Sequence, residues 1–216
     1  MSIEHSLNNI KENLKDAKLL AVSKFVEASR VSEAIDAGQK IFGENYVQEA
    51  KKKKQELLAL GYKDFDFHLI GSLQSNKAKD AVGLFSLIHS VDRVSLAKAI
   101  SKEAVKKSIT QDILIQINVS LEATKSGVLE ENFEPLLDAC LKLDALKIRG
   151  IMTIGSFGES GLKEFEKMKL IFDKYQDRFS EKKELSMGMS SDYKLAIEHG
   201  ATIVRVGTSI FGSRTI

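Results

Sequence analysis

The stretch Leu19-Leu20-Ala21-Val22-Ser23-Lys24 is an apolar run that ends in a lysine. Short apolar runs with polar boundaries are typical of buried strands, and residues 27–37 have the spacing of a helix that ends at Gly38. A lysine at the end of a buried strand lies at the rim of a core, where desolvation makes an amine a usable nucleophile. The alternative is a lysine whose stem packs on that rim while its ammonium group reaches water.

The pattern of this stretch, a short apolar run followed by a helical segment, recurs along the whole chain. We count eight apolar runs, at residues 19–23, 40–43, 66–71, 85–91, 112–119, 146–154, 184–189 and 202–208. Strand and helix alternating eight times predict a parallel sheet closed into a (β/α)8 TIM barrel. An open α/β sheet is the alternative, but no G-x-G-x-x-G follows the first strand, which weakens a dinucleotide-binding fold.

Helices are expected between these strands and also before the first one. An apolar stripe predicts an extra N-terminal helix within residues 3–17. Asp92 is expected to cap the helix at 93–107, Pro135 to lie in a first helical turn, and residues 209–216 to form a short tail. The other helices are expected at 27–37, 46–60, 74–82, 132–143, 161–177 and 191–198.

Composition limits the class of protein. The 216 residues, 43% of them hydrophobic, suit one domain spanning 1–216, and a net charge of +2 gives no electrostatic case for nucleic-acid binding. The polar N-terminus is no signal peptide, no apolar run has the roughly 20 residues of a membrane helix, and no Cys/His cluster suggests a metal site. The single cysteine, Cys140, favours a reducing compartment, so we expect a cytoplasmic protein.

Function in such barrels lies at the C-terminal ends of the strands. The seventh apolar run leads into Ser190 and Ser191, and the eighth ends in Gly207 and Thr208. Backbone N–H groups and hydroxyls at such turns form anion sites, and barrels commonly hold a phosphate after these two strands. Capping of the next helix by a serine uses the same groups, so the sequence leaves both interpretations open.

Arg205 interrupts the apolar character of the last strand. By strand alternation it shares the inward face with Ile203 and Gly207. A guanidinium group inside a barrel needs a partner, which is either a buried carboxylate or a ligand atom that accepts a hydrogen bond.

Eight ordered stretches resemble the YggS/PROSC family of pyridoxal phosphate homeostasis proteins, which are single-domain relatives of the alanine racemase barrel. Together they span nearly the whole chain. They are residues 21–24, 42–46, 68–77, 117–119, 125–128, 149–154, 185–192 and 204–214.

The resemblance implies that the cofactor is pyridoxal 5′-phosphate (PLP) and assigns it a set of residues. Lys24 would form the Schiff base, and Arg205 would face the pyridine nitrogen. Asn45 and the Met152 region would line the ring pocket. Ser190, Gly207 and Thr208 would hold the phosphate, together with backbone amides around Ser191.

The implied function is PLP binding for intracellular homeostasis and delivery to PLP-dependent apoenzymes, with little or no turnover. An arginine at the pyridine nitrogen discourages ring protonation and weakens the ring as an electron sink, although racemisation stays possible. An amino-acid racemase, the alternative, needs a second acid/base. Related racemases take this second acid/base from the β-domain of a partner subunit, and we do not expect a β-domain here. The remaining candidates are Tyr46, His68 and His199. Without the dimer contact that the β-domain makes, we also expect a monomer. A lysine Schiff-base aldolase acting on a phosphosugar is a third hypothesis and would not be yellow as isolated.

Overall fold

The computed structural model describes residues 2–120, 122, 124–156 and 159–212 and contains a closed parallel barrel, which confirms the predicted fold. Each strand pairs with the next along the chain, and β8 pairs back onto β1 with Arg205 beside Leu20. The strands are β1 (Lys18–Val22), β2 (Ile41–Glu44), β3 (Asp66–Leu69), β4 (Leu87–Val91), β5 (Gln111–Gln116), β6 (Leu146–Met152), β7 (Glu184–Ser186) and β8 (Ile203–Val206).

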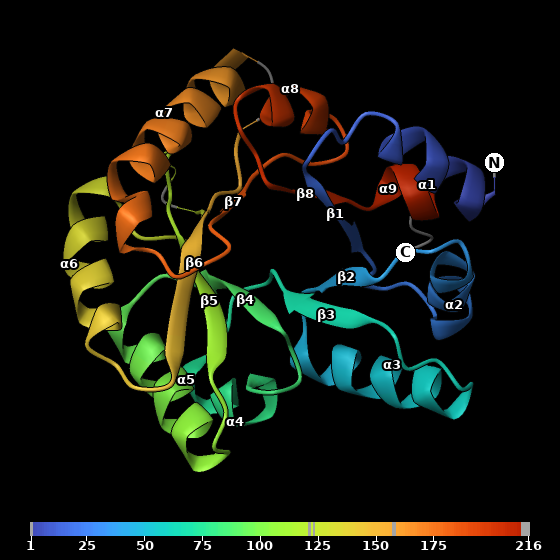
Figure 1. Ribbon diagram of the computed structural model, residues 1–216, viewed down its shortest axis with the longest axis horizontal. Coiled ribbons are helices and arrows are strands. Elements are labelled where there is room, and N and C mark those ends of the chain that lie inside the picture. The colour runs from blue at the N-terminus through green and yellow to red at the C-terminus, as the bar shows by residue number, and fades with distance from the viewer. Residues whose placement is uncertain (1, 121, 123, 157–158, 213–216) are drawn as a thin grey trace.

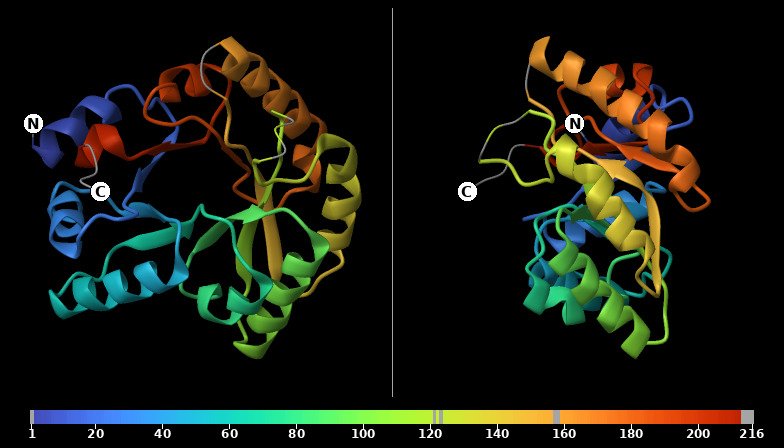
Figure 2. Two further views of the ribbon diagram at one scale, coloured as in Figure 1. Left: turned by 180° about the vertical axis from the view of Figure 1, so that it is seen from behind. Right: turned by 90° about the vertical axis from the view of Figure 1, so that its left-hand side faces the viewer.

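Helices form a ring around these strands (Figure 1), and the side view in Figure 2 shows loops at the two ends of the barrel. α1 precedes the barrel and packs against α2 and α9. The helices are α1 (Ile3–Lys11), α2 (Ala28–Asp36), α3 (Val47–Ala59), α4 (Ala78–Ala81), α5 (Val94–Lys106), α6 (Glu130–Leu141), α7 (Glu159–Tyr175), α8 (Tyr193–Glu198) and α9 (Thr208–Phe211). Within the described ranges, no helix has both the length and the apolar character that crossing a membrane takes.

The hydrophobic core has two layers, because successive side chains of a strand point to opposite faces. The larger layer lies between the strands and the helix ring and includes Phe42, Phe67 and Ile88. A smaller cluster contains Leu20, Leu87, Leu114, Met152 and Ile203. Its members alternate along their strands with residues of the outer layer, so this cluster fills the inside of the barrel.

Several local expectations were wrong. Arg93, not Asp92, occupies the N-cap position of α5 and makes no side-chain cap bond, and the Asp92 carboxylate pairs with Arg93 instead. α6 begins at Glu130, so Pro135 lies inside the helix rather than in its first turn. By contrast, the extra N-terminal helix forms within residues 3–17 as predicted, and it ends at Lys11.

The expected C-terminal tail is also partly helical. Residues 208–211 form the single turn of α9 against α1, while residues 213–216, which include the last two positions of the resembling stretch 204–214, lie outside the described part of the chain.

Candidate functional site

A cavity of about 450 Å³ opens at the C-terminal ends of β1, β2, β7 and β8. Its apolar walls are formed by Val22, Ile70, Ile154 and Met189. Seven of the eight residues assigned to a site from the sequence also line it, namely Lys24, Asn45, Ser190, Ser191, Arg205, Gly207 and Thr208. A larger hollow of about 650 Å³, beside α2 and α3, contains none of these seven.

Lys24 and Asn45 reach the cavity from two neighbouring strands. Each follows its strand closely, and both side chains are half-buried. Gly71 makes room for this arrangement, since a Cβ there would lie 2.3 Å from the Asn45 carbonyl oxygen. Any larger residue at position 71 would push the Asn45 backbone out of place.

The loop after β7 is shaped by Gly188, which has a φ of +90° and lies so close to α8 that a Cβ would be 2.5 Å from the Ala196 Cβ. Neither Ser190 nor Ser191 caps α8, because Asp192 holds the N-cap position and makes no side-chain cap bond. Ser190 Oγ instead accepts a hydrogen bond of 3.2 Å from the Gly207 N–H. The structure thus joins the two loops that the sequence indicated for a phosphate.

Arg205 lies inside the barrel with its side chain almost fully buried. It donates from Nη1 to Ser186 Oγ at 2.8 Å and from Nη2 to the Thr153 carbonyl oxygen at 2.7 Å. Burial lowers the pKa of Arg205 to about 10, against the opposing effect of the Asp192 charge. No carboxylate of the described residues lies within 4.0 Å of the guanidinium group, so a buried ion pair does not explain it.

A chain of polar side chains continues from Arg205 across the barrel interior. Ser186 Oγ lies 3.1 Å from His89 Nδ1, and His89 Nε2 lies 3.0 Å from His68 Nδ1. Burial lowers the pKa of His68 to about 3, with a further contribution from the Lys18 charge, and burial also lowers the pKa of His89 well below its usual value. Both imidazoles are therefore neutral at physiological pH. Their contact was not evident from the sequence.

Met152 is the one assigned residue outside the cavity lining. It is fully buried in the cluster inside the barrel. Ile154, two residues further along the chain, reaches the cavity wall instead. Within the Met152 region, Ile154 therefore lines the cavity, while Met152 itself packs in the barrel interior.

The three candidates for a second acid/base do not line this cavity. Tyr46 is half-exposed and packs against the Phe25 ring, with centroids 5.6 Å apart. His68 lies in the interior chain described above, and His199 Nδ1 is 2.8 Å from the Leu195 carbonyl oxygen at the end of α8.

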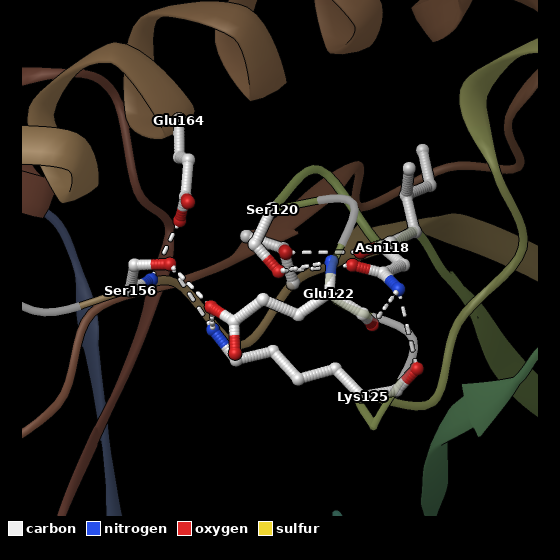
Figure 3. A network of polar contacts seen from close by, with 8 residues as sticks. Asn118, Ser120, Glu122, Lys125, Ser156 and Glu164 are labelled. Carbon is white, nitrogen blue, oxygen red and sulfur yellow. Dashed lines mark hydrogen bonds and ion pairs between the residues drawn. The ribbon is translucent and has the colours of Figure 1, made fainter.

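A polar network ties the loop after β5 to the loop after β6 (Figure 3). Lys125 Nζ lies 2.8 Å from Glu122 Oε1 and 3.1 Å from Ser156 Oγ, and the Ser156 N–H donates to Glu164 Oε2 at 2.6 Å. Asn118 Nδ2 donates to the Glu122 and Lys125 carbonyl oxygens. These contacts tie the described part of the Lys125 loop to Ser156 in the loop after β6.

The donor set of the cavity defines the ligands that it suits. It offers one primary amine, a buried guanidinium group, hydroxyls, and the backbone N–H groups of two turns. Amide and hydroxyl donors suit a phosphate, and an amine at the end of a strand suits a carbonyl carbon. The residues present therefore fit a phosphorylated aldehyde.

Comparison with known proteins places this barrel in a class. The family model described as "Alanine racemase, N-terminal domain" matches residues 1–215. The alanine racemase of Corynebacterium glutamicum has the same fold, with a TM-score of 0.76 at 18% identity over 99% of this chain and 61% of that chain. The fold and site thus define a barrel of the alanine racemase type.

Relatives of higher identity narrow the class. The pyridoxal phosphate homeostasis protein of Aquifex aeolicus is 45% identical over 92% of this chain and 87% of its own length, and that of Escherichia coli K12 is 37% identical over 98% and 97%. PipY of Synechococcus elongatus PCC7942, solved with PLP bound, has a TM-score of 0.89 at 36% identity, covering 98% of this chain and all of PipY. The chain belongs to the family of pyridoxal phosphate homeostasis proteins.

Proposed function

We propose that this protein binds PLP through Lys24 and serves PLP homeostasis by holding the cofactor and releasing it to PLP-dependent apoenzymes. The observation that carries the proposal is the single cavity that brings Lys24 together with Arg205 and the joined turns at Ser190 and Gly207. The PLP-bound structure of the related PipY supports the choice of cofactor.

Lys24 supplies the covalent link in this proposal. Its amine attacks the aldehyde carbon, a C=N bond forms, and one water molecule leaves. Water reverses the step, and the amine of another protein's lysine can replace Lys24 without oxidant or reductant. A PLP reservoir needs this reversibility, because the cofactor must remain transferable.

The other residues orient and bind. The Gly207 N–H and the hydroxyls of Ser190 and Thr208 are proposed to hold the phosphate, with backbone amides around Ser191. Arg205 is proposed to donate to the pyridine nitrogen, and Asn45 to line the ring. When bound, PLP supplies an electrophilic aldehyde and a conjugated ring.

We also propose that residues 1–216 form one PLP-binding domain that acts as a monomer in the cytoplasm. The buried free thiol of Cys140, whose pKa burial raises to about 11, suits a reducing compartment. The molecular mass of the PLP-loaded protein, measured by sedimentation over a range of concentrations, tests whether it is a monomer.

A transfer assay tests the homeostasis role and separates it from racemisation. Loaded protein is mixed with a PLP-dependent apoenzyme, and recovery of that enzyme's activity is followed with and without a scavenger of free PLP. In parallel, alanine and serine are incubated with the loaded protein in deuterated water. We expect transfer without sustained α-deuterium exchange, whereas exchange that continues over many turnovers would identify a racemase and overturn the reservoir role.

A further inference from the structure

A buried ionic cluster lies between β2 and α3, on the outer side of the barrel wall from the cavity. It consists of Glu44, Glu49 and Lys53, which we call the β2–α3 cluster. Lys53 Nζ lies 2.7 Å from Glu44 Oε1 and 3.0 Å from Glu49 Oε1. The side chains of Lys53 and Glu44 are 5% and 0% exposed, which is rare for charged residues and needs a reason.

The cluster holds the backbone immediately before Lys24. Lys53 Nζ donates to the Ser23 carbonyl oxygen at 2.6 Å, which gives each of its three N–H bonds an acceptor. The Ser23 hydroxyl donates to Glu44 Oε1 at 2.6 Å. The cluster therefore binds both the hydroxyl and the carbonyl oxygen of Ser23.

The cluster also holds the backbone immediately after Lys24. The Phe25 N–H donates to Glu49 Oε1 at 2.5 Å, the same oxygen that contacts Lys53. Phe25 has a φ of +62°, in the left-handed region that residues other than glycine rarely adopt, and its ring is exposed. A residue in this conformation persists only where its surroundings hold it.

The two attachments bracket a single residue. Because successive side chains alternate, the Ser23 hydroxyl points outward to the cluster while Lys24 lines the cavity. The cluster itself does not line that cavity. Through the Ser23 carbonyl and the Phe25 N–H, the cluster contacts the backbone on either side of Lys24.

The burial of Glu44 marks the cluster as more than a generic ion pair. Its second carboxylate oxygen, Oε2, is buried and has no hydrogen-bond partner among the described residues. Burial raises the pKa of Glu44, against the lowering effect of Lys53. Well-packed apolar residues in place of the whole buried ion pair are often neutral or stabilising, so stability alone does not account for the cluster.

We propose that Glu49, Lys53 and Glu44 are positioning residues that fix the backbone on both sides of Lys24, so that its amine is held at the cavity in the geometry that captures PLP. The proposal rests on the proposed function, since it assigns Lys24 the cofactor. It predicts that loosening the cluster slows PLP capture while the cavity residues stay unchanged.

The variants Glu49→Ala and Glu49→Gln form the decisive pair. Alanine removes the acceptor of the Phe25 N–H, whereas the glutamine amide oxygen can still accept it. Glu49 is on the surface side of the cluster, with a side chain 24% exposed, so both variants should fold. Glu56→Ala is the matched control, because Glu56 lies on the same helix and pairs only loosely with Lys52, at 3.7 Å.

Two readouts are needed, and one of them requires no cofactor. Hydrogen exchange of the Phe25 amide in PLP-free protein should speed up in Glu49→Ala and stay near the wild-type rate in Glu49→Gln and Glu56→Ala. The rate of PLP capture, followed by absorbance at limiting PLP, should fall roughly fivefold to tenfold in Glu49→Ala, the effect of one lost hydrogen bond, and recover in Glu49→Gln.

Lys53→Met provides a second test, in which PLP capture should slow in protein that circular dichroism shows to be folded. Because Lys53→Met alone leaves the Glu44 carboxylate without its buried cationic partner, the double variant Lys53→Met/Glu44→Gln removes that charge as well. Wild-type capture rates and Phe25 exchange in Glu49→Ala would overturn the positioning role. Failure of the wild-type protein itself to take up PLP at Lys24 would overturn the proposed function instead, so the two failures are distinct.

Discussion

His68 Nδ1 and His89 Nε2 lie 3.0 Å apart inside the barrel, on neighbouring strands β3 and β4. Arg205 donates to Ser186 Oγ, so the Ser186 hydrogen can point to His89 Nδ1, and His89 can then donate from Nε2 to His68. This order joins two neutral histidines to the guanidinium group in the cavity without placing a second charge beside it.

The two histidines predict a stability that depends on pH. In the unfolded chain a histidine takes up a proton near pH 6.5, but burial lowers the pKa of His68 to about 3. The unfolded state then binds more protons than the folded state, so stability falls as pH decreases through this window. His68 alone should remove about 1.4 kcal/mol of unfolding free energy per pH unit.

Urea unfolding above and below about pH 6.5 measures this dependence. His68→Gln should flatten it relative to the wild type. An unaltered slope in His68→Gln would mean that the interior pair does not titrate as described.

Replacement of Arg205 should weaken cofactor binding. Among the described residues that line the cavity, Arg205 and Lys24 carry the cationic side chains, and Arg205→Met removes one of them. A lost hydrogen bond from a charged donor costs about 1.5–3 kcal/mol. Equilibrium dialysis should show PLP affinity reduced at least about tenfold. Arg149→Met is the control, because Arg149 pairs with Asp112 away from the cavity; equal losses in both variants would argue against a direct contact.

The phosphate assignment predicts a difference between PLP and pyridoxal. Ser190→Ala deletes the hydroxyl that joins the two turns, and we expect PLP affinity to fall by about 0.5–1.5 kcal/mol. Affinity for pyridoxal, which lacks the phosphate, should not change. If the variant weakened both ligands equally, Ser190 would act on the ring or on the fold rather than on the phosphate.

The position of Met152 predicts an effect on stability alone. Met152→Leu should cost less than about 1.5 kcal/mol of unfolding free energy, and Met152→Ala about 2–5 kcal/mol, since the side chain fills the barrel interior. PLP affinity should stay at the wild-type value in Met152→Leu. A clear loss of affinity there would restore Met152 to the ring pocket.

The barrel was predictable because parallel strands buried on both faces read as continuous apolar runs, as at residues 19–22, where every residue is apolar and buried. Site residues at strand ends followed from the same count, since the C-terminal ends meet at one edge. Lys24, Ser190 and Gly207 reach one cavity for this reason.

What the sequence did not predict involves features that depend on register or on three-dimensional contact. The pairing of β5 with β6 shifts register between Ile113 and Leu114, so counting along the chain does not fix which side chains of β6 reach the cavity. The single turn of α9 is too short to show a periodicity. His68 is two residues from Ile70, and His89 is two residues from Leu87, so strand alternation indicates that both histidines face the barrel interior. Their contact, however, depends on how β3 and β4 pair.

Anchoring of PLP at Lys24 is the central claim, and borohydride reduction tests it most directly. Wild-type protein and Lys24→Ala are treated with PLP and reduced, and the modified peptides are identified by mass spectrometry. We predict a pyridoxyl group on Lys24 in the wild type and its loss in Lys24→Ala. A label spread over other lysines, or present equally in both proteins, would contradict the account.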